Sequence, residues 1–451
     1  MKRIRLRDNT NERSISREEY EGCEDELIYL SSQTIANLKD SKGRSVLIFP
    51  HSIKHAEDLD ENQKIINVNY ALSDGRKVVR SIETGNLMGF IGLNGLEINI
   101  SSRFVENDRE DYFLHYMLQK VMNINVFNFE HVARKDDMFD LLPFMFPYYL
   151  KKALRQGIFR QYVTHRHDDA NVRGVINVAR HLRKNMPFNF SISYDTRDYD
   201  ADNSLIQLIR HTIEYIRKKK YGNSILYADS DTISAVAQFV SLTPSFNVRQ
   251  QDSIINENRR PFRHPYYTEY NALQKLCLQI LRHEKVKYSE NKDKVNGILF
   301  DGAWLWEEYV ATLLAKLYFV HPRNKKGEGR IYLCEGKYPR YPDFYYGGMS
   351  NSYILDAKYK RDIDSRDDVN QILAYMYRLS GRGCGFVLPK KYDEEKETFT
   401  LRKLLGDYGK NLTEYRITIP HGLTSYEEFK EKMEVHEQSF LNILNQRLQR
   451  Y

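Results

Sequence analysis

The spacing of apolar residues changes twice along this chain, and these changes limit the folds that it can adopt. Over about the first 110 residues, short runs of β-forming residues (45–49, 65–70 and 77–82) alternate with turn signals. Asn94-Gly95, between two apolar runs, predicts a tight hairpin turn that leads into an alternating strand over 96–100. The sequence therefore predicts a β-rich N-terminal domain.

Helical spacing replaces this pattern from about residue 111. It predicts helices within 111–160, over 204–219 and over 266–283. We expect the aspartate-rich stretch 195–203 to be a loop or a helix start, and the polar stretch 250–263 to be a connector. The middle of the chain is therefore predicted to be mostly helical.

The C-terminal third of the chain predicts an α/β domain, because expected strands there are bracketed by expected helices. The helices are 304–319 and 367–379, and the strands are 330–335, 341–346, 353–359 and 385–388. The whole chain thus predicts an α+β multidomain protein. Its expected parts are a β-rich domain at 1–140, a mostly helical region at 141–290 and an α/β domain at 291–451.

Composition excludes several classes of protein. With 451 residues the chain is too long for one ordinary core, so we expect two or three domains. The four cysteines are scattered without a CxxC pair, which argues against a zinc ribbon and against a disulfide framework. No apolar run is long enough to span a membrane, and no secretory signal is visible, so we expect a cytoplasmic protein. The net charge of +7 is compatible with a polyanionic partner but does not identify one.

Two carboxylates and one lysine near the C-terminal strands form the pattern with the most chemical content. Alternate residues of a strand share a face, so Asp356 and Lys358 project to the same side. A short turn at Gly347-Gly348 would bring the strand that carries Asp343 back beside them. The order Pro-Asp, twelve residues, Asp-x-Lys is the PD-(D/E)XK nuclease signature.

Hydrolysis of a phosphodiester needs such a group of side chains. Paired carboxylates hold a hard cation such as Mg²⁺, with Mn²⁺ as an alternative, and the cation polarises the phosphoryl group. A lysine orients or deprotonates the attacking water, or neutralises charge in the transition state. We therefore predict a metal site at Asp343 and Asp356, with Lys358 catalytic. The alternative is a turn aspartate beside a surface ion pair, because so short a pattern also occurs by accident.

The helix expected just before this pattern carries a candidate third acidic group. Its apolar residues fall on one face, with Glu307 at the flank of that face and Glu308 nearly opposite. Glu307 is therefore the better candidate to reach the metal. The alternative is that both glutamates are simply solvated.

A pair of residues after the lysine strand is a candidate for substrate contact or support of the site. Gln371 and Tyr375 lie four residues apart on an expected helix, and hence on one face. Packing explains the same spacing equally well.

Three further polar features have ordinary explanations. His165–Asp169 has the residue types of a metal cluster, but we expect a polar loop. The basic run Arg217–Lys220 suits the negative end of a helix dipole. Lys325, Lys326 and Arg330 are candidates for non-specific contact with phosphate.

Short motifs spread through much of the chain occur together in a characteristic order. They are Gly89–Gly92, Leu96–Ile100, Arg160–Tyr162, Val172–Ile176, Tyr194 with Asp202-Asn203, Leu305-Trp-Glu307, Pro342-Asp343, Asp356–Lys360, and Gln371 with Tyr375. In this order and spacing they resemble the McrC family, the nuclease subunits of McrBC-type restriction systems that cut DNA carrying modified cytosine. Trp306 stands where that family more usually has phenylalanine.

The resemblance implies a function and a partner. The metal site would be Asp343 and Asp356, with Lys358 catalytic and Glu307 supporting. The chain would act on double-stranded DNA with modified cytosine, together with an McrB-like AAA+ GTPase hexamer that it stimulates through its N-terminal part, 1–140. Two alternatives stay open: a stand-alone PD-(D/E)XK nuclease, and a non-catalytic adaptor that activates an AAA+ motor.

Overall fold

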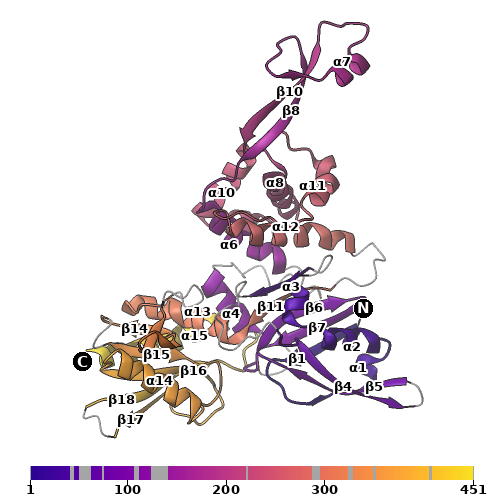
Figure 1. Cartoon of the computed structure of the whole chain (residues 1–451). Coiled ribbons are helices and arrows are strands. Elements are labelled where there is room, and N and C mark those ends of the chain that lie inside the picture. The colour runs from indigo at the N-terminus through magenta and orange to yellow at the C-terminus, as the bar shows by residue number, and fades with distance from the viewer. Residues whose placement is uncertain are drawn as a thin grey trace. The chain divides into compact units, whose positions relative to one another are not determined.

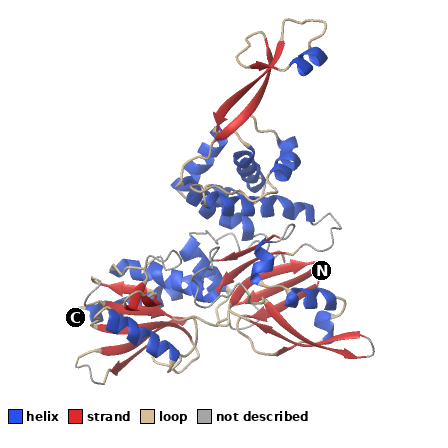
Figure 2. Ribbon diagram, viewed as in Figure 1, coloured by secondary structure: helices blue, strands red, loops and turns tan. Residues whose placement is uncertain are grey.

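The computed structural model describes residues 2–40, 45–49, 62–73, 76–105, 111–122, 141–219, 222–286, 295–322, 329–348, 352–405 and 409–449. The chain divides into two compact units, one formed by residues 1–124 with 291–451 and the other by residues 125–290. Figure 1 follows the chain through both units, and Figure 2 marks their helices and strands. The first unit combines the two ends of the chain, whereas the sequence predicts three consecutive segments. The roles assigned to those segments stay predictions.

Five strands form the first sheet of the unit that contains both ends of the chain. Their order is β1 (Lys2–Arg7), β7 (Leu96–Ser101), β6 (Leu87–Leu93), β11 (Asn296–Asp301) and β3 (Ser45–Phe49). β6 pairs antiparallel with β7 and β11, while β1 pairs parallel with β7, and β3 with β11. β6 is buried along its whole length, which explains why its sequence is apolar without alternation. β11 comes from the C-terminal part of the chain and completes a sheet of N-terminal strands.

The predicted hairpin turn between β6 and β7 is confirmed. Leu93 pairs with Leu96, and the two residues between them, Asn94 and Gly95, have φ angles of 46° and 88°. Two successive positive φ angles are typical of a type I′ turn, which asparagine and glycine adopt with little strain. The turn fixes the register of the strand that ends at Ser101.

A smaller sheet and three short helices share a core with the first sheet. The strands, in spatial order, are β2 (Arg13–Ser14), β5 (Arg76–Thr84) and β4 (Ile66–Ser73), and the helices are α1 (Arg17–Tyr20), α2 (Glu24–Ser32) and α3 (Ile35–Asp40). Leu27 and Leu30 of α2 are buried in the same cluster as Val79 and Ile82 of β5. These strands match the β-rich N-terminal region that the sequence predicts.

A second five-stranded sheet lies in the C-terminal part of the same unit. Its order is β14 (Phe344–Tyr346), β15 (Tyr353–Ala357), β16 (Gly383–Lys391), β18 (Asn411–Ile419) and β17 (Phe399–Lys403). β15, β16 and β18 run parallel, whereas β14 and β17 are antiparallel edge strands. Helix α14 (Asp367–Arg378) connects β15 to β16 and packs on both, and Ile354, Ile372 and Phe386 lie in their shared core. The hairpin β12 (Ile331–Cys334) and β13 (Lys337–Arg340) precedes this sheet.

Three helices join the two sheets of this unit. They are α4 (Tyr112–Met122), α13 (Gly302–Leu314), which is extended by the 3-10 turn η3 (Ala315–Leu317), and α15 (Tyr426–Leu448). The buried carboxylate of Glu437 on α15 accepts hydrogen bonds from the hydroxyls of Tyr116 and Tyr309 at 2.7 and 2.8 Å. Hydroxyl donors thus satisfy a buried charge where the three helices meet.

The second unit is a helical bundle that carries a β arm. The helices are α6 (Leu141–Leu154), α8 (Ser204–Arg217), α9 (Gly222–Leu226), α10 (Ser230–Ser241), η2 (Val248–Gln250), α11 (Gln251–Glu257) and α12 (Glu269–Val286). The arm consists of β8 (Gln161–Asp169) paired antiparallel with β10 (Ile192–Asp200), and of β9 (Val175–Ile176) and α7 (Val178–Lys184) at its end. In Figure 1 the long hairpin β8–β10 extends away from the bundle and ends in β9 and α7.

The arm overturns two sequence predictions. The stretch 195–203, expected to be a loop or a helix start, contributes its first six residues to β10, and His165–Asp169, expected to be a polar loop, lies within β8. Both faces of this ribbon are partly exposed, so neither strand shows the apolar alternation of a half-buried strand. The expected connector 250–263 also contains the short helix α11.

None of the helices in the described part of the chain is both long and apolar enough to cross a membrane.

Candidate functional site

Strand β15 supplies the centre of the candidate site. Asp356 is almost fully buried, with 1% of its side chain exposed, and its Oδ2 lies 2.9 Å from Nζ of Lys358. The strand ends at Ala357, but the backbone N–H of Lys358 still donates to the carbonyl of Val387 on β16 at 3.0 Å. The alternation expected from the sequence therefore brings this carboxylate and this ammonium together.

Asp343 joins the same site from the residue before β14. β14 pairs antiparallel with β15, so that Phe344 lies opposite Leu355. Oδ2 of Asp343 accepts a hydrogen bond from the backbone N–H of Ala357 at 2.9 Å. The turn after β14 thus carries Asp343 back to the strand of Asp356 and Lys358, and the structure brings all three residues together.

The charges of these groups act strongly on one another. Burial raises the pKa of Asp343 well above its usual value, and the neighbouring carboxylates of Asp356 and Glu307 raise it further. Burial by itself would lower the pKa of Lys358, but the carboxylates of Asp356 and Asp343 outweigh it, and the pKa of this ammonium is raised. The carboxylates of Asp343, Asp356 and Glu307 and the ammonium of Lys358 therefore lie close enough to shift the pKa values of Asp343 and Lys358.

Gln371 and Tyr375 on α14 hold the lysine in place. Nζ of Lys358 donates to Oε1 of Gln371 at 2.8 Å, and Nε2 of Gln371 donates to the hydroxyl of Tyr375 at 2.7 Å. The Tyr375 hydroxyl in turn donates to the backbone carbonyl of Tyr341 at 3.2 Å, two residues before Asp343. The helical spacing of four residues thus connects the lysine strand to the segment that carries Asp343.

Asp368, which the sequence analysis did not single out, is a further acidic neighbour of the lysine. It is buried at the start of α14, and its Oδ1 lies 3.7 Å from Nζ of Lys358. Its carboxylate also pairs with Lys360 at 2.7 Å. Asp-x-x-Gln within one helix turn was the available signal, because a spacing of three residues places Asp368 and Gln371 near one face of α14.

Glu307 reaches the site from α13, and His321 links it to Asp343. Oε1 of Glu307 lies 3.8 Å from Nε2 of His321, whose Nδ1 is 3.0 Å from the backbone oxygen of Asp343. The imidazole also packs on Phe344, with ring centroids 4.8 Å apart. Sequence reasoning missed His321, since a single histidine after a helix carries no local signal. Glu308 instead accepts a hydrogen bond from Nε1 of Trp304 at 3.1 Å.

The donors fit a hard cation that keeps much of its water. Asp356 is almost fully buried, and its Oδ2 has the ammonium of Lys358 as a charged neighbour at 2.9 Å. Burial raises the pKa of its neighbour Asp343, and the carboxylates of Asp356 and Glu307 raise it further; a divalent cation relieves such repulsion. Among the described residues, however, no three side chains of His, Cys, Asp or Glu are already arranged as a metal-binding group. The arrangement suits Mg²⁺, which is commonly held by one or two carboxylates and several waters.

The predicted basic contacts are placed only in part. Lys325 and Lys326 lie outside the described residues. The guanidinium carbon of Arg330 lies 5.2 Å from the ring centroid of Tyr332, beside the hairpin β12–β13. Contact of these three residues with phosphate therefore stays a prediction.

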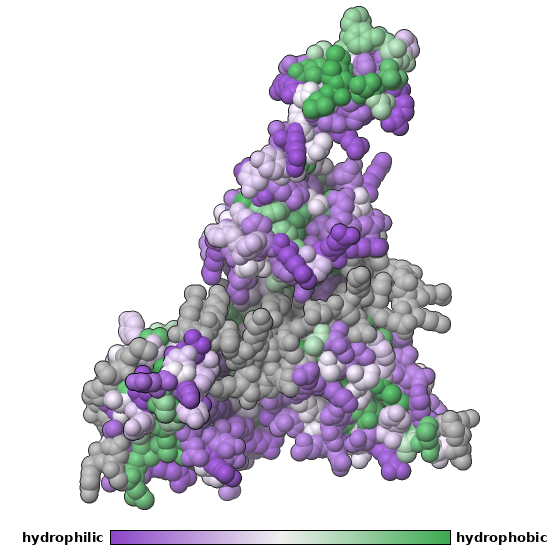
Figure 3. Space-filling view, in the orientation of Figure 1, coloured by the Kyte–Doolittle hydropathy of each residue, from purple (hydrophilic) through white to green (hydrophobic). Residues whose placement is uncertain are grey.

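The end of the β arm is a second candidate site, of a different kind. Val175 and Phe190 expose 79% and 80% of their surface. Other large apolar side chains exposed on the same arm are Tyr162, Ile176, Val178, Leu182, Met186, Phe188 and Tyr199. Figure 3 shows hydrophobic residues gathered at the end of the arm. A group of exposed apolar side chains such as this is typical of a surface that binds another macromolecule.

Comparison with known proteins identifies a family and likenesses to solved structures. Residues 82–388 match the family model described as "McrBC 5-methylcytosine restriction system component". No curated protein matches the chain in sequence. A refined half-complex from a tetradecameric assembly of Thermococcus gammatolerans McrB AAA+ hexamers with bound McrC contains a chain with a TM-score of 0.54 and 15% identity. That likeness covers 98% of this chain and 99% of the other.

A second solved structure, the cryo-EM structure of the Thermococcus gammatolerans McrBC complex, has a TM-score of 0.34 and 15% identity over 70% of this chain and 87% of the other. The first likeness supports a shared fold along the whole chain, and the family model covers more than half of the residues.

Proposed function

This chain belongs to the McrBC 5-methylcytosine restriction system component family, and from this premise we propose that it is the DNA-cutting subunit of a modification-dependent restriction system. The observation that carries the proposal is the meeting of Asp343, Asp356 and Lys358 beside Gln371. The substrate would be double-stranded DNA with modified cytosine, and the reaction would be hydrolysis of a phosphodiester.

The fold around these residues supports a nuclease of the PD-(D/E)XK type. The signature residues lie on a mixed sheet, with Asp343 just before edge strand β14 and Asp356 on the neighbouring strand β15. α13 contributes Glu307 and α14 contributes Gln371, so both helices supply side chains to one end of the sheet.

Mg²⁺, or Mn²⁺ in its place, would be held by Asp343 and Asp356, with Glu307 in support. When bound, such an ion supplies positive charge to the phosphoryl oxygens and makes a bound water more acidic. The carboxylates themselves bind the ion and fix where the scissile phosphate lies.

Lys358 would act directly on the reacting phosphate. Its ammonium lies 2.8 Å from Oε1 of Gln371 and 2.9 Å from Oδ2 of Asp356, and these contacts pre-organise it for the binding of DNA. A fixed cation lowers the barrier by neutralising the charge that builds up on the phosphoryl oxygens, without the cost of reorganisation during the reaction. Gln371 and Tyr375 would act through Lys358, by keeping it in this position.

We infer that the chain works with an AAA+ GTPase. The structurally similar McrC of Thermococcus gammatolerans is bound to McrB AAA+ hexamers. The apolar end of the β arm supports such a partner, because Val175 and Phe190 are left to solvent. The N-terminal segment 1–140 stays a second candidate for the contact.

Deletion of residues 1–140 is not a clean test of that contact. Strands β1, β6 and β7 lie in this segment and pair with one another, and β6 also pairs with β11. Their loss would expose the core that β11 shares with them, and the unit would unfold for reasons unrelated to a partner.

A plasmid-nicking assay tests the proposed function. Supercoiled plasmid with modified cytosine is incubated with the full chain and Mg²⁺, with and without the AAA+ protein encoded beside it and GTP or ATP. Asp356→Ala is expected to abolish cleavage while folding and stimulation of the partner's nucleotide hydrolysis are kept. The matched control is Glu437→Gln, which changes a buried carboxylate outside the site and keeps its hydrogen-bond acceptor.

The outcomes separate the competing functions. Cleavage by Asp356→Ala at the wild-type rate would falsify the assignment of the site. A wild-type chain that stimulates the motor but never cuts would make it an adaptor. Cutting that is indifferent to the AAA+ protein would make it a stand-alone nuclease.

A further inference from the structure

Tyr359 follows the proposed catalytic lysine and points the other way. Only 5% of it is exposed. Its hydroxyl lies 2.8 Å from Oγ of Ser102 and donates to Sδ of Met88 at 3.4 Å. Oγ of Ser102 also accepts from the backbone N–H of Phe104, so the serine is free to donate its own proton to Tyr359. The tyrosine hydroxyl is therefore satisfied by residues more than 250 positions earlier in the chain.

The Tyr359 ring is held from several directions. The guanidinium carbon of Arg103 lies 4.8 Å from the ring centroid, and the ring of Phe104 packs edge-on at 5.2 Å. Gly302, the first residue of α13, lies against the ring so closely that a Cβ there would meet Cε1 of Tyr359 at 2.7 Å. A larger residue at 302 would push the tyrosine out of place.

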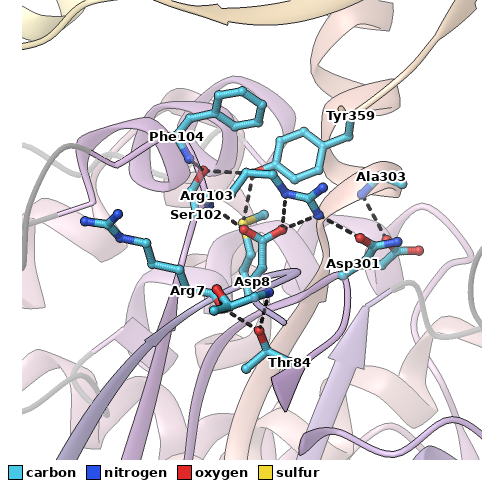
Figure 4. A network of polar contacts seen from close by, with 12 residues as sticks. Arg7, Asp8, Thr84, Ser102, Arg103, Phe104, Asp301, Ala303 and Tyr359 are labelled. Atoms are coloured by element: carbon cyan, nitrogen blue, oxygen red, sulfur yellow. Dashed lines mark hydrogen bonds and ion pairs between the residues drawn. The ribbon is translucent and has the colours of Figure 1, made fainter. Parts of the chain in front are cut away.

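Arg103 is itself fixed by a buried aspartate at the end of β1. Nε and Nη2 of Arg103 donate to Oδ2 of Asp8 at 2.9 and 2.6 Å, and the backbone N–H of Arg103 donates to Oδ1. Nη2 also donates to Oδ1 of Asn86 at 2.7 Å, and the carbonyl of Asn86 accepts from the N–H of Gly302 at 2.8 Å. Figure 4 shows Asp8 contacting Arg103, and Ser102 and Arg103 lying beside Tyr359. A forked ion pair of this kind has little freedom to shift.

The direction of Lys358 depends on this arrangement. Successive residues of an extended chain point to opposite sides. The backbone rotation that places the Tyr359 side chain beside Ser102 and Arg103 therefore also directs the Lys358 side chain toward Asp356. β15 ends at Ala357, and the two residues that follow are no longer held along a full ladder. Beyond the end of the strand, the contacts of the Tyr359 side chain with Ser102 and Arg103 help to fix the backbone next to Lys358.

We propose that Tyr359 is a positioning residue, and that the socket formed by Asp8, Ser102, Arg103 and Gly302 makes the N-terminal sheet part of the cutting machinery. This inference rests on the proposed nuclease function. It assigns to the N-terminal sheet a role in orienting Lys358, in addition to any contact with a partner. A tyrosine that merely filled the core would affect stability and leave the rate of cutting per folded molecule unchanged.

The test compares two buried tyrosines, Tyr353 at the start of β15 and Tyr359 two residues after its end. Tyr359→Phe removes the hydroxyl that meets Ser102 and Met88. The matched control, Tyr353→Phe, removes a hydroxyl that lies 2.9 Å from that of Tyr415, within the C-terminal sheet. Each full-length variant is assayed under single-turnover conditions with Mg²⁺ and the AAA+ partner. Rates are divided by the folded fraction, and DNA affinity is measured separately.

Tyr359→Phe is expected to lower the single-turnover rate about tenfold while DNA affinity stays within about twofold, because a small misplacement of a catalytic group affects the transition state more than the ground state. Tyr353→Phe is expected to keep the wild-type rate. Hydrogen exchange supplies a readout that does not need cutting: the amide of Lys358 should exchange faster in Tyr359→Phe and not in Tyr353→Phe. Gly302→Ala, which drives a methyl group into the ring, should reproduce the loss of rate.

Lys358→Met separates this inference from the function beneath it. If Lys358→Met cuts like the wild type, the proposed function is wrong. If Lys358→Met is inactive while Tyr359→Phe cuts at the wild-type rate, the function stands and the positioning role is wrong. Equal losses in Tyr359→Phe and Tyr353→Phe also contradict the positioning role, because they indicate a general effect of losing a buried hydroxyl.

Discussion

The C-terminal sheet and the β arm differ in which side chains they bury: the sheet buries charged groups, and the arm exposes apolar ones. Around β15 the charged groups are buried and paired, as Asp356 is with Lys358. On the arm the polar groups form the ribbon, through contacts such as Arg180 with Asp195 at 2.6 Å, while Val175 and Phe190 are left exposed. The first region buries charged side chains, whereas the second exposes apolar ones to solvent.

This difference indicates two kinds of function. Burying charges is costly unless their geometry is fixed, so a buried charged cluster fits a site that must hold reacting groups in place. An exposed apolar end lowers its free energy when another surface covers it, so it fits a site that gains its order from a partner. Mutations in the first region should therefore affect chemistry, and mutations at the end of the arm should affect assembly.

The largest effect is expected at the lysine. Lys358→Met should reduce cleavage per folded molecule by about a thousandfold, because it removes a fixed cation from the transition state. Lys358→Arg keeps a positive charge beside Asp356 and should therefore lose less stability. Its planar guanidinium cannot reproduce the position of the ammonium that donates to Gln371, so cleavage should still be reduced. Quenched-flow cleavage together with circular dichroism measures both quantities. Cleavage at the wild-type rate by either variant would contradict the assignment of the region around β15 to chemistry.

At the end of the arm, the double variant Val175→Ser, Phe190→Ser should weaken the complex with the AAA+ partner about tenfold or more. Stability should change by less than about 0.5 kcal/mol, because both side chains are already exposed. Gel filtration and stimulation of nucleotide hydrolysis measure assembly. Leu405→Ser, at an exposed leucine of the other unit, is the control. A complex of unchanged affinity would mean that the exposed end serves some other contact.

Single aspartates in the two units should also make stability depend on pH with opposite signs. Burial raises the pKa of Asp111 in the first unit to about 6, although the N–H groups of Leu114 and Ser102 oppose the shift. The folded state therefore holds this proton more tightly than the unfolded chain, and the free energy of unfolding should fall as pH rises from about 4 to about 6, by at most about 3 kcal/mol. Asp111→Asn should remove this slope in denaturant titrations.

On the arm, hydrogen bonds from Asn185, Lys184 and Ser193 lower the pKa of Asp168. This carboxylate therefore stabilises the arm above the pKa of the unfolded chain, near 4, and the contribution is lost as the solution is acidified further. Proteolysis of the arm at pH 3 and pH 7, in the wild type and in Asp168→Asn, measures the effect. Faster cleavage of the wild-type arm at pH 7 than at pH 3, after correction for protease activity, would reverse the expected sign.

The smallest effect is expected at Trp306. Its indole N–H donates at 3.1 Å to the Val387 carbonyl, which also accepts from the N–H of Lys358. Trp306→Phe loses one hydrogen bond but leaves the carbonyl with its second donor, so a loss of about 1 kcal/mol is expected in thermal unfolding. Cleavage per folded molecule should change by less than about threefold. A loss as large as that of Lys358→Met would mean that the indole itself holds the site together.

Local patterns predicted much of the ordered core. The runs expected at 45–49, 96–100 and 353–359 correspond to β3, β7 and β15, and the helical spacing over 204–219 corresponds to α8. These elements bury at least one apolar face or are apolar throughout, so their period is visible in the sequence. The same reasoning failed at 195–203, because a ribbon with both faces in solvent needs no apolar period.

The candidate site was predicted to a similar degree. Asp343, Asp356 and Lys358 could be placed together because strand alternation and a short turn are local geometry. His321 and Asp368 were missed, because their place in the site depends on contacts with residues of other elements, Asp343 and Lys358 respectively. The roles of all these residues in cutting DNA stay predictions.

By itself, the sequence determined which residues share a strand face or a helix face, because side-chain direction follows from backbone repeats of two or 3.6 residues. It thereby determined the pairing of Asp356 with Lys358 and of Gln371 with Tyr375. Only the tertiary structure decided that β11 joins the N-terminal sheet and that Ser102 meets Tyr359. Such contacts between distant segments depend on how whole surfaces pack, and no local repeat encodes them.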